Sequence, residues 1–560
     1  KRVWLKLSML SGCLGCCFPE TDSKSVRAMG NSTSSTTGKE KGSGSSAPSP
    51  KEDGRPKRGG SELETILSRA ESRLSKIAVT GRYHNLPKKL EDDYQLDSKV
   101  LGSGYNGSVY LATKGKDKFA VKDFKLRGIS KKKKEELEGE CEIFLAMDHP
   151  HVARLTDVYE SAEKLSLVME CMEGGELFDR VLAKKKFAEK DAAYAAYQML
   201  LAINYLHTQG IVHRDIKLEN WLYEKEDSDH LKLIDFGFSK IWDHTDTKMK
   251  MSCGTLAYVA PEVLAKNYTS QCDIWSLGIV VFILLVGYMP FSGSDEKQMR
   301  NITKGEYSWK PDKWKLVSAE GADFVKKLLV VNPEVRLNAR TALSHPWLGK
   351  RTETTSGAVD EEIVNSLREF AQESKFRRAC MQAMAWSLSN EERSAVRQAF
   401  IALDKTKGGT ITLAEFKQVM QDQFHIEDRQ VQEAFDAIDV GHNGEIMYSE
   451  FLAAMVSSRI SMHDELLQTT FKRFDTDSSG YISAANLREV LGGTLTPEEL
   501  NAMMSEIDAN HDGKISYEEF IHYCRSPHAH DTHKELSNKV IDGAQEGDDT
   551  RVKKFKSRDV

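Results

Sequence analysis

The pattern of hydrophobic positions predicts a long buried helix near the middle of the chain. Residues 274–291 carry no charge, a run long enough to be compared with a membrane span. Gly278, Gly287 and Pro290 interrupt the run. We therefore predict a buried helix of a globular domain, not a helix that crosses a membrane.

Shorter apolar stretches before that helix predict strands. Residues 108–112 and 119–122 contain the β-branched and aromatic residues that strands favour. Residues 165–170 form a third, mostly apolar stretch. The first part of the chain is therefore expected to contain a sheet.

A junction segment, residues 359–389, has apolar residues at helical spacing with basic residues between them. This combination predicts a basic amphipathic helix, which is typical of calmodulin targets. An ordinary packed helix is the alternative. The apolar positions are Ile363, Leu367, Phe370, Phe376, Cys380 and Met384, and the basic ones are Lys375, Arg377 and Arg378.

The two ends of the chain have no comparable pattern. Residues 31–60 are rich in Ser, Gly and Pro, a composition that favours disorder. Residues 62–77 have apolar positions near helical spacing and are interpreted as a packed extension. We assign residues 1–93 as a whole to a disordered N-terminal extension and residues 531–560 to a polar tail.

An internal repeat occupies residues 391–526. Four acidic loops begin at Asp404, Asp439, Asp475 and Asp508, at intervals of 33 to 36 residues. Each loop has Gly at its sixth position and Ile at its eighth. This is the pattern of the EF-hand, in which oxygen atoms of a twelve-residue loop bind Ca²⁺. The repeats are assigned to residues 391–426, 427–461, 462–497 and 498–530.

The four loops differ in their ligands. The loop at Asp508 is complete, whereas Asn486 replaces the closing Glu of the loop at Asp475. We expect the fourth loop to bind Ca²⁺ best and the first, with Thr406 and Gly408 at ligand positions, to be least occupied. The candidate ligands are Asp508, Asn510, Asp512, Lys514 (through its carbonyl) and Glu519; Asp475, Asp477, Ser479 and Tyr481; Asp439, Asn443, Glu445 and Glu450; and Asp404 and Glu415.

Composition narrows the class of protein. The net charge is −6, with 40% hydrophobic and 29% charged residues, so a dominant nucleic-acid surface is not indicated. The nine cysteines show no paired spacing across the folded part, which favours a reduced, intracellular setting. We expect a cytoplasmic monomer that binds no nucleic acid.

Two competing signals for lipid attachment lie near the N-terminus. The sequence from Met29 fits the myristoylation pattern at Gly30, provided that Met29 is the initiator. Palmitoylation of Cys13, Cys16 and Cys17 requires a start upstream of Met29, and the alternative is that this segment is not translated. Any membrane association is expected to come from N-terminal acylation.

A glycine-rich loop precedes the first predicted strand. Gly102, Gly104 and Gly107 have the G-x-G-x-x-G spacing, with Val109 two residues later. Dinucleotide-binding folds share this spacing but place a helix after it. Because strand-favouring residues follow here, the loop is predicted to be a hairpin that covers phosphates.

The strongest chemical signal is the sequence His-Arg-Asp-Ile-Lys-Leu-Glu-Asn at residues 213–220, followed by Asp235-Phe-Gly. A γ-phosphoryl group in transfer carries spread negative charge, so the reaction needs cations and an oriented nucleophile. Asp215 can accept the proton of the substrate hydroxyl, and Lys217 can reach the γ-phosphate. Asn220 and Asp235 can hold Mg²⁺. This spacing indicates a protein kinase that uses ATP and Mg²⁺, and Lys217 indicates Ser/Thr specificity.

Together, these motifs resemble the calcium-dependent protein kinases of plants and apicomplexan parasites, over about residues 94–526. The resemblance implies an α+β bilobal protein kinase fold in residues 94–348, an autoinhibitory junction helix in residues 359–389 and an all-α pair of EF-hand lobes. It implies a Ser/Thr kinase that is inhibited by its junction helix. Ca²⁺ binding to the EF-hands of the same chain would relieve this inhibition. The alternatives are a Ca²⁺-binding pseudokinase scaffold, a kinase whose EF-hands only buffer Ca²⁺, and a kinase regulated by separate calmodulin.

The resemblance also implies the ATP site. Glu140 is preferred to Glu142 as the partner of Lys122 because of its distance from Pro150. Glu176 would face the ribose or one basic residue upstream of the acceptor Ser/Thr in protein substrates. Met251 stands at the usual activation-loop phosphosite, which leaves phosphorylation there open. The expected cofactor-binding residues are Leu101, Gly102, Gly104, Gly107, Val109, Ala120, Lys122, Glu140, Met169, Glu170, Met172, Glu176 and Asp235.

Overall fold

The computed structural model describes most of the chain between residues 70 and 526. The lipidation signals, Met251 and the polar tail fall outside the described residues. Those described are 70–71, 74, 79, 81–86, 88–104, 107–184, 187–241, 249, 254–351, 359–456, 458, 460, 462–491 and 495–526.

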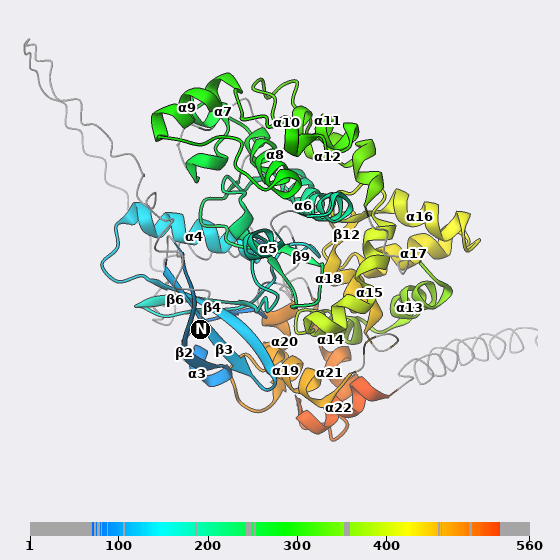
Figure 1. The fold of residues 1–560 in the computed structure, drawn as a ribbon. Coiled ribbons are helices and arrows are strands. Elements are labelled where there is room, and N and C mark those ends of the chain that lie inside the picture. Colours follow the sequence, from blue (N-terminus) through cyan, green and yellow to red (C-terminus); the bar gives the residue numbers. More distant parts are fainter. Residues whose placement is uncertain are drawn as a thin grey trace, which may run out of the picture. The chain divides into compact units, whose positions relative to one another are not determined.

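The first lobe is a six-stranded sheet with the strand order β1-β5-β6-β4-β3-β2. Figure 1 labels β2, β3, β4 and β6 of this sheet. β1 runs parallel to β5, and the other neighbouring strands are antiparallel. Ser130 accepts a hydrogen bond from Lys133 N and so caps the N-terminus of helix α4. The elements are β1 (Tyr83–His84), α3 (Leu90–Asp93), β2 (Gln95–Gly104), β3 (Gly107–Lys114), β4 (Asp117–Lys125), α4 (Lys131–Leu145), β5 (Leu155–Glu160) and β6 (Lys164–Glu170).

The second lobe is mainly helical, and α6 (Glu189–Thr208) packs beside α8 (Gln271–Val286) (Figure 1). The uncharged run predicted to be a buried helix is α8, which is buried from Cys272 to Val286. Among the described residues, no helix is long and apolar enough to cross a membrane. The other elements are α5 (Leu177–Lys184), β7 (Ile211–Val212), η2 (Leu218–Asn220), β8 (Trp221–Tyr223), β9 (Leu231–Leu233), β10 (Lys240–Ile241), η3 (Leu256–Tyr258), α7 (Pro261–Leu264), α9 (Asp295–Lys304), α10 (Pro311–Trp314), α11 (Ala319–Leu328), α12 (Ala339–Leu343) and η4 (Pro346–Lys350).

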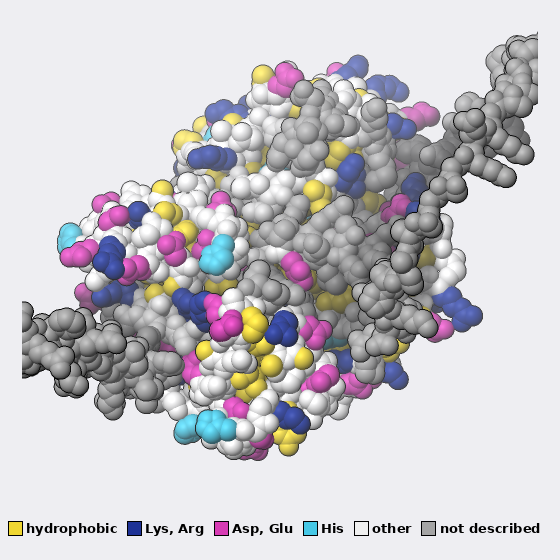
Figure 2. Space-filling model, turned by 180° about the vertical axis from the view of Figure 1, so that it is seen from behind, with side chains coloured by type: hydrophobic (Ala, Val, Ile, Leu, Met, Phe, Trp, Pro, Cys, Tyr) yellow, Lys and Arg dark blue, Asp and Glu magenta, His cyan; other side chains and the backbone are white. Residues whose placement is uncertain are grey.

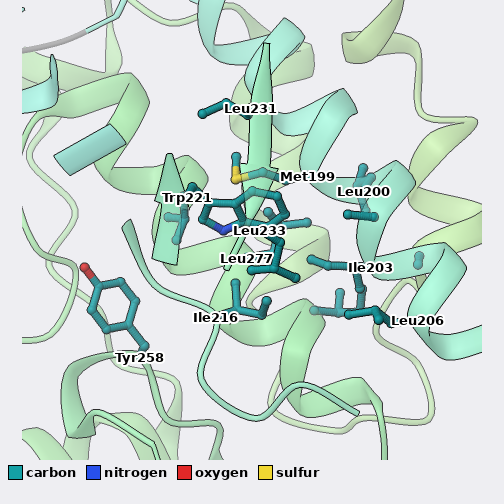
Figure 3. Packing of buried hydrophobic residues seen from close by; sticks show 14 of the residues in the cluster. Met199, Leu200, Ile203, Leu206, Ile216, Trp221, Leu231, Leu233, Tyr258 and Leu277 are labelled. Carbon is teal, nitrogen blue, oxygen red and sulfur yellow. The ribbon is translucent and has the colours of Figure 1, made fainter. Parts of the chain in front are cut away.

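The core of this lobe lies directly behind residues 213–220. Figure 3 shows the Trp221 ring at the centre of a group that includes Met199, Leu233 and Ile216. All four side chains are fully buried. Close packing of this kind leaves little room for movement, so the loop that carries Asp215 rests on a rigid base.

The junction contains two helices, α13 (Glu361–Gln372) and α14 (Lys375–Ala385), so the expectation of a single helix over residues 359–389 is wrong. The Ser374 hydroxyl accepts a hydrogen bond from Arg377 N and starts the second helix. A serine favours this cap because its oxygen satisfies a free backbone N–H. Both apolar sets named above are buried.

Eight helices follow, in the helix–loop–helix order expected of four EF-hands. Short strands pair the loops two by two, with Ile411 opposite Ile446 and Ile482 opposite Ile515. The all-α region predicted from the repeat is therefore confirmed. The elements are α15 (Asn390–Leu403), β11 (Ile411–Thr412), α16 (Leu413–Asp422), α17 (Asp428–Ile438), β12 (Glu445–Ile446), α18 (Tyr448–Met455), α19 (Asp464–Phe474), β13 (Ile482–Ser483), α20 (Ala484–Leu491), α21 (Pro497–Ile507), β14 (Lys514–Ile515) and α22 (Tyr517–Arg525).

The expectation that residues 1–93 are disordered is wrong for the part closest to the first lobe. Arg82 is 1% exposed and donates hydrogen bonds to the carbonyls of Leu155 (2.7 Å) and Leu145 (2.8 Å). β1 pairs with β5, and Leu90 is buried in the sheet core. These contacts depend on residues far along the chain, so local composition does not reveal them.

Candidate active site and calcium-binding loops

Asp273, in the first turn of α8, fixes the backbone of the loop that carries Asp215. Its carboxylate accepts hydrogen bonds from His213 N (2.9 Å) and Arg214 N (2.8 Å), and it lies 2.9 Å from His207 Nε2. Arg214 has a φ of 68°, a left-handed conformation that costs about 1–3 kcal/mol in a non-glycine residue. Asp273 therefore holds this strained turn, a role that the sequence did not suggest.

The Asp215 carboxylate is surrounded by the groups expected from the sequence. Lys217 Nζ lies 2.5 Å from Asp215 Oδ2. Asn220 Nδ2 donates to the Asp215 carbonyl (2.8 Å) and faces Oδ2 at 3.3 Å. Thr255 Oγ1 donates to Oδ1 at 3.3 Å. An acid, a cation and an amide thus share one small site, with the activation segment bound to it through Thr255.

Lys122 is bound by two carboxylates from different elements. Its Nζ lies 2.6 Å from Glu140 Oε1 on α4 and 2.8 Å from Asp235 Oδ1. Burial would lower the pKa of Lys122, but the two carboxylates outweigh it and raise the pKa. Burial would likewise raise the pKa of Asp235, and Lys122 lowers it. Of the two candidate glutamates, Glu140 forms the ion pair with Lys122. This ion pair holds α4 close to the site.

The glycine-rich segment is a hairpin of β2 and β3. Gly104 stands opposite Gly107 in its register. Gly107 has a φ of 156°, and a Cβ atom there would lie 2.4 Å from the Asp123 carbonyl oxygen, so only glycine fits. In the adjoining strands Ala120 stands opposite Met169. Leu101, Gly102, Val109, Met169 and Met172 are all partly buried around this hairpin and the end of β6.

Glu170 was expected at the ATP site, but its side chain makes its contacts elsewhere. The carboxylate accepts hydrogen bonds from Lys232 Nζ (2.7 Å) and Arg154 N (2.7 Å). It also accepts one from the Arg393 guanidinium, on α15 of the first EF-hand. Burial would raise the pKa of Glu170, but Arg393 and Lys232 outweigh it and lower the pKa to about 2. Only the backbone of Glu170 is left to contact a nucleotide.

Glu176 belongs to an acidic group beside the Asp215 loop. Burial, with the nearby charges of Asp179 and Glu219, raises the pKa of Glu176 to about 7. Glu219 Oε2 is buried and has no hydrogen-bond partner among the described residues. No role for Glu219 was predicted from the sequence, although it lies next to Asn220. Such a group can bind a basic side chain.

The side chain of Arg214 binds the start of the activation segment. Its Nε donates to the Phe238 carbonyl (2.5 Å), and one terminal nitrogen donates to the Tyr268 hydroxyl (3.3 Å). Both partners are neutral oxygens; Phe238 lies in the segment, whereas Tyr268 follows it, between α7 and α8. The start of the segment is thus attached to the Asp215 loop through the Phe238 carbonyl.

The fourth EF-hand loop has its oxygens arranged around backbone N–H groups. Asp508 accepts from Asp512 N (3.1 Å) and Gly513 N (2.8 Å). Glu519 accepts from Ser516 N (2.9 Å), and such backbone bonds lower its pKa. Hard oxygen ligands at these positions fit Ca²⁺. Among the described residues, no group of three or more His, Cys, Asp or Glu side chains is arranged to hold a metal ion. The predicted ligand set of this loop also contains Asn510 and the Lys514 carbonyl.

The third loop closes through an amide. Asn486 Oδ1 accepts from Ser483 N (2.9 Å), as Glu519 does in the fourth loop, but its Nδ2 donates to Thr476 Oγ1 (2.9 Å). Asp475 accepts from Ser479 N and Gly480 N, each at 2.9 Å. The side chain that should deliver two oxygens therefore offers one, and that one is already bonded.

The second loop is closed by a buried glutamate. Glu450 accepts from Gly441 N and Met447 N, each at 2.9 Å, and burial raises its pKa to about 8. Asp439 accepts from Asn443 N (3.1 Å) and Gly444 N (2.9 Å). The loop keeps its first, fifth and twelfth positions in place.

The first loop contains a lysine whose ammonium group donates hydrogen bonds to nearby backbone carbonyls. Lys407 Nζ donates to the carbonyls of Ile401 and Asp404, each at 2.6 Å. A Cβ atom at Gly409 would lie 2.5 Å from the ring of Tyr205 on α6. This loop packs against the kinase-like lobe and has an internal cation, which disfavours Ca²⁺.

The junction helices are covered by EF-hand helices. α14 contacts α18 of the second EF-hand and α19 of the third. The Phe376 ring lies 5.5 Å from that of Phe474 and 5.8 Å from that of Tyr523. Arg377 donates to the carbonyls of Tyr523 (3.1 Å) and Ser526 (2.7 Å). Both EF-hand pairs thus bind the same junction helix.

Comparison with protein families matches residues 95–348 to the protein kinase domain and residues 361–456 and 464–525 to the EF-hand domain pair. Among curated proteins, calcium-dependent protein kinase 3 of Plasmodium berghei is 34% identical over 470 residues, which are 81% of this chain and 84% of the relative. Calcium-dependent protein kinase 34 of Arabidopsis thaliana is 34% identical over 439 residues, 76% of this chain and 83% of the relative.

Proposed function

The chain belongs to the calcium-dependent protein kinases and is a Ca²⁺-activated protein serine/threonine kinase, and from that membership we propose roles for its residues. Asp215 acts as the base that orients the acceptor hydroxyl and takes its proton. Lys217, 2.5 Å from Asp215, stabilises charge on the transferring phosphoryl group. Lys122, held by Glu140, binds the α- and β-phosphates.

Mg²⁺ is proposed as the ion that accompanies ATP. Asn220 and Asp235 supply the amide and carboxylate oxygens that this hard ion prefers, and both border the site of Asp215 and Lys122. When bound, Mg²⁺ neutralises phosphate charge. The backbone of Glu170 and Met172 would receive the adenine, below the hairpin of Gly104 and Gly107.

We propose that the junction inhibits the kinase when the EF-hands release it, and that Ca²⁺ keeps it bound to them. One observation carries this proposal: the apolar side of α14 is buried between helices of the second and third EF-hands. A helix held in this way is not free to act on the kinase lobes. Because Ca²⁺ changes the angle between EF-hand helices, it can strengthen this grip.

Kinase activity measured as a function of the free Ca²⁺ concentration tests this proposed regulation. Phe376→Ala removes an aromatic side chain between Phe474 and Tyr523 and should move half-maximal activation to higher Ca²⁺, with the same maximal rate. Gln372→Ala, at an exposed position of α13, is the control and should leave the curve unchanged. An unchanged curve for Phe376→Ala would refute control through this contact.

The same assay separates the alternatives. Purified full-length protein, ATP and a serine peptide are compared in Ca²⁺ and in chelator, with and without added calmodulin. The buried face of α14 supports stimulation by Ca²⁺ alone, because an external calmodulin would have to displace the EF-hands. Equal rates in Ca²⁺ and chelator would support EF-hands that only buffer, and no transfer in either would support a pseudokinase.

We propose that protein substrates carry a basic residue upstream of the acceptor. The carboxylates of Glu176, Asp179 and Glu219 lie together beside the Asp215 loop, and an arginine would neutralise them. A peptide array with and without upstream arginine tests this preference.

Acidic and basic side chains are interspersed on the face seen in Figure 2, which supports our expectation that nucleic acid is not a partner.

We also propose a monomeric, cytoplasmic enzyme. Five cysteines of the described part are free, and Cys141, Cys272, Cys380 and Cys524 are buried, which supports a reducing compartment. Myristoylation of Gly30 would add a weak membrane anchor. The intact mass of the cellular protein decides whether Gly30 is the first residue and is modified.

A further inference from the structure

Gly441, at the third position of the second EF-hand loop, touches the N-terminal extension. A Cβ atom at Gly441 would lie 2.3 Å from the carbonyl oxygen of Leu74. Gly441 is not among the residues with positive φ, so its backbone does not require glycine. The close approach of the Leu74 carbonyl does require it, because any side chain would displace that oxygen.

The Leu74 oxygen lies beside the third position of the loop, where Gly441 supplies no side-chain ligand. An aspartate places its carboxylate oxygens about 2.4 Å from Cβ, given bond lengths of about 1.5 and 1.2 Å. The Leu74 oxygen lies 2.3 Å from the Cβ position at Gly441. Asn443 Nδ2 and Glu450 Oε1 each lie 3.5 Å from this Cβ position. A carbonyl oxygen is also a normal ligand of Ca²⁺. The carbonyl therefore matches an aspartate oxygen in distance and in chemistry.

Leu74 is held in place by packing on both sides. Its side chain forms a buried cluster with Trp386, at the end of α14, and Met447 of the second loop. The guanidinium groups of Arg82 and Arg154 lie 3.7 Å and 4.4 Å from the centre of the Trp386 ring. Leu74 thus contacts both the loop and the end of the junction, and Arg82 links the junction to the first lobe.

We propose that the Leu74 carbonyl supplies the third-position ligand of the Ca²⁺ site in the second EF-hand. This inference rests on the proposed Ca²⁺ binding of that loop. By linkage, Ca²⁺ at the loop and docking of the N-terminal segment stabilise each other to the same extent. Leu74 is then part of the calcium switch.

The experiment uses the full-length protein, with Ca²⁺ binding measured by calorimetry and docking measured by hydrogen exchange of residues 70–84. Glu450→Gln identifies the binding phase of the second loop by removing it. Gly441→Ala displaces the carbonyl and should weaken that phase at least tenfold, with faster exchange in residues 70–84. Gly408→Ala, at a glycine with no atom closer than 3.5 Å to its Cβ position, should leave the phase unchanged.

Gly441→Asp separates ligand supply from docking. The new carboxylate replaces the carbonyl, so Ca²⁺ affinity should return to at least the wild-type value while Ca²⁺ no longer protects residues 70–84. Leu74→Asp, which breaks the cluster with Trp386, should weaken the phase as Gly441→Ala does, but not in the Gly441→Asp background.

Two results would overturn the inference alone. One is a second-loop phase that Glu450→Gln removes but Gly441→Ala leaves within twofold of wild type. The other is tighter binding in Gly441→Ala, which would mean that the carbonyl blocks the loop. If Glu450→Gln changes no phase, the loop does not bind Ca²⁺, and both the assignment of the loop and the inference fail.

Discussion

The Arg393 guanidinium, on the first helix of the first EF-hand, donates a hydrogen bond to the carboxylate of Glu170, at the end of strand β6 in the kinase domain. Both side chains are buried. Met172, two residues after Glu170, is expected to contact adenine. The EF-hand region therefore makes a charged contact at the end of β6, two residues before the residue expected to contact adenine.

Arg393→Ala should lower stability and weaken ATP binding. Breaking a buried ion pair costs about 3–5 kcal/mol, and the lower end applies here because Lys232 still faces Glu170. The melting temperature should fall by on the order of 5–10 °C, and the KM for ATP should rise several-fold, because the end of β6 loses its support.

Arg397→Ala is the matched control for this effect. Arg397 is one turn further along α15 and pairs at 2.8 Å with Glu224, the residue after strand β8. It should lower the melting temperature similarly without changing the KM for ATP. Equal changes in KM for both variants would show that loss of docking, and not the contact to Glu170, is responsible.

Asp215→Asn should lower kcat by about 10²–10⁴-fold, the usual contribution of a general base. An amide keeps the shape of the side chain but cannot accept the proton of the substrate hydroxyl. ATP affinity, measured by calorimetry, should stay within about twofold because Lys122 and Asp235 are unchanged. Turnover close to wild type would mean that Asp215 is not the base.

The calcium loops should rank as their ligands do. Glu519→Gln removes the bidentate carboxylate of the fourth loop and should move activation to Ca²⁺ concentrations about tenfold higher or more. Glu415→Gln changes the first loop, in which the Lys407 ammonium group binds the Asp404 carbonyl. This variant should have little effect on Ca²⁺ binding. Calorimetry of the full-length variants would reverse this ranking if Glu415→Gln removed the tightest phase and Glu519→Gln left it.

The preference for an upstream arginine should grow as pH rises through 7. The pKa of Glu176 is raised to about 7, so its carboxyl is protonated below that pH and charged above it. The ratio of kcat/KM for peptides with and without the arginine should increase about fivefold from pH 6 to pH 8, since a charged partner makes the stronger hydrogen bond. Glu176→Gln should flatten this dependence, and a ratio that falls with pH would contradict it.

Local motifs predicted the site well where neighbouring residues in the sequence act together. Asp215, Lys217 and Asn220 share one loop, and their side chains meet there. The pairing of Lys122 with Glu140 crosses two elements, yet a strand followed by a helix was enough to suggest it.

Contacts between distant segments left no local signal. Asp273 immediately precedes the uncharged run of residues 274–291, and its role depends on how α8 meets the loop at Arg214. Arg393 resembles any basic residue on a helix until Glu170 lies opposite. Ser374, in contrast, is a recognisable cap, but the basic residues after it suggested one continuous helix.

The short strand β1 has a further consequence for how the protein behaves when it is cut. It occupies the outer side of β5, so that the row of β5 backbone groups facing it is partly covered. A fragment that begins at residue 94 would lose β1 and Arg82 and leave that border of the sheet open. Uncovered strand borders recruit other chains, so such a fragment is expected to self-associate during purification.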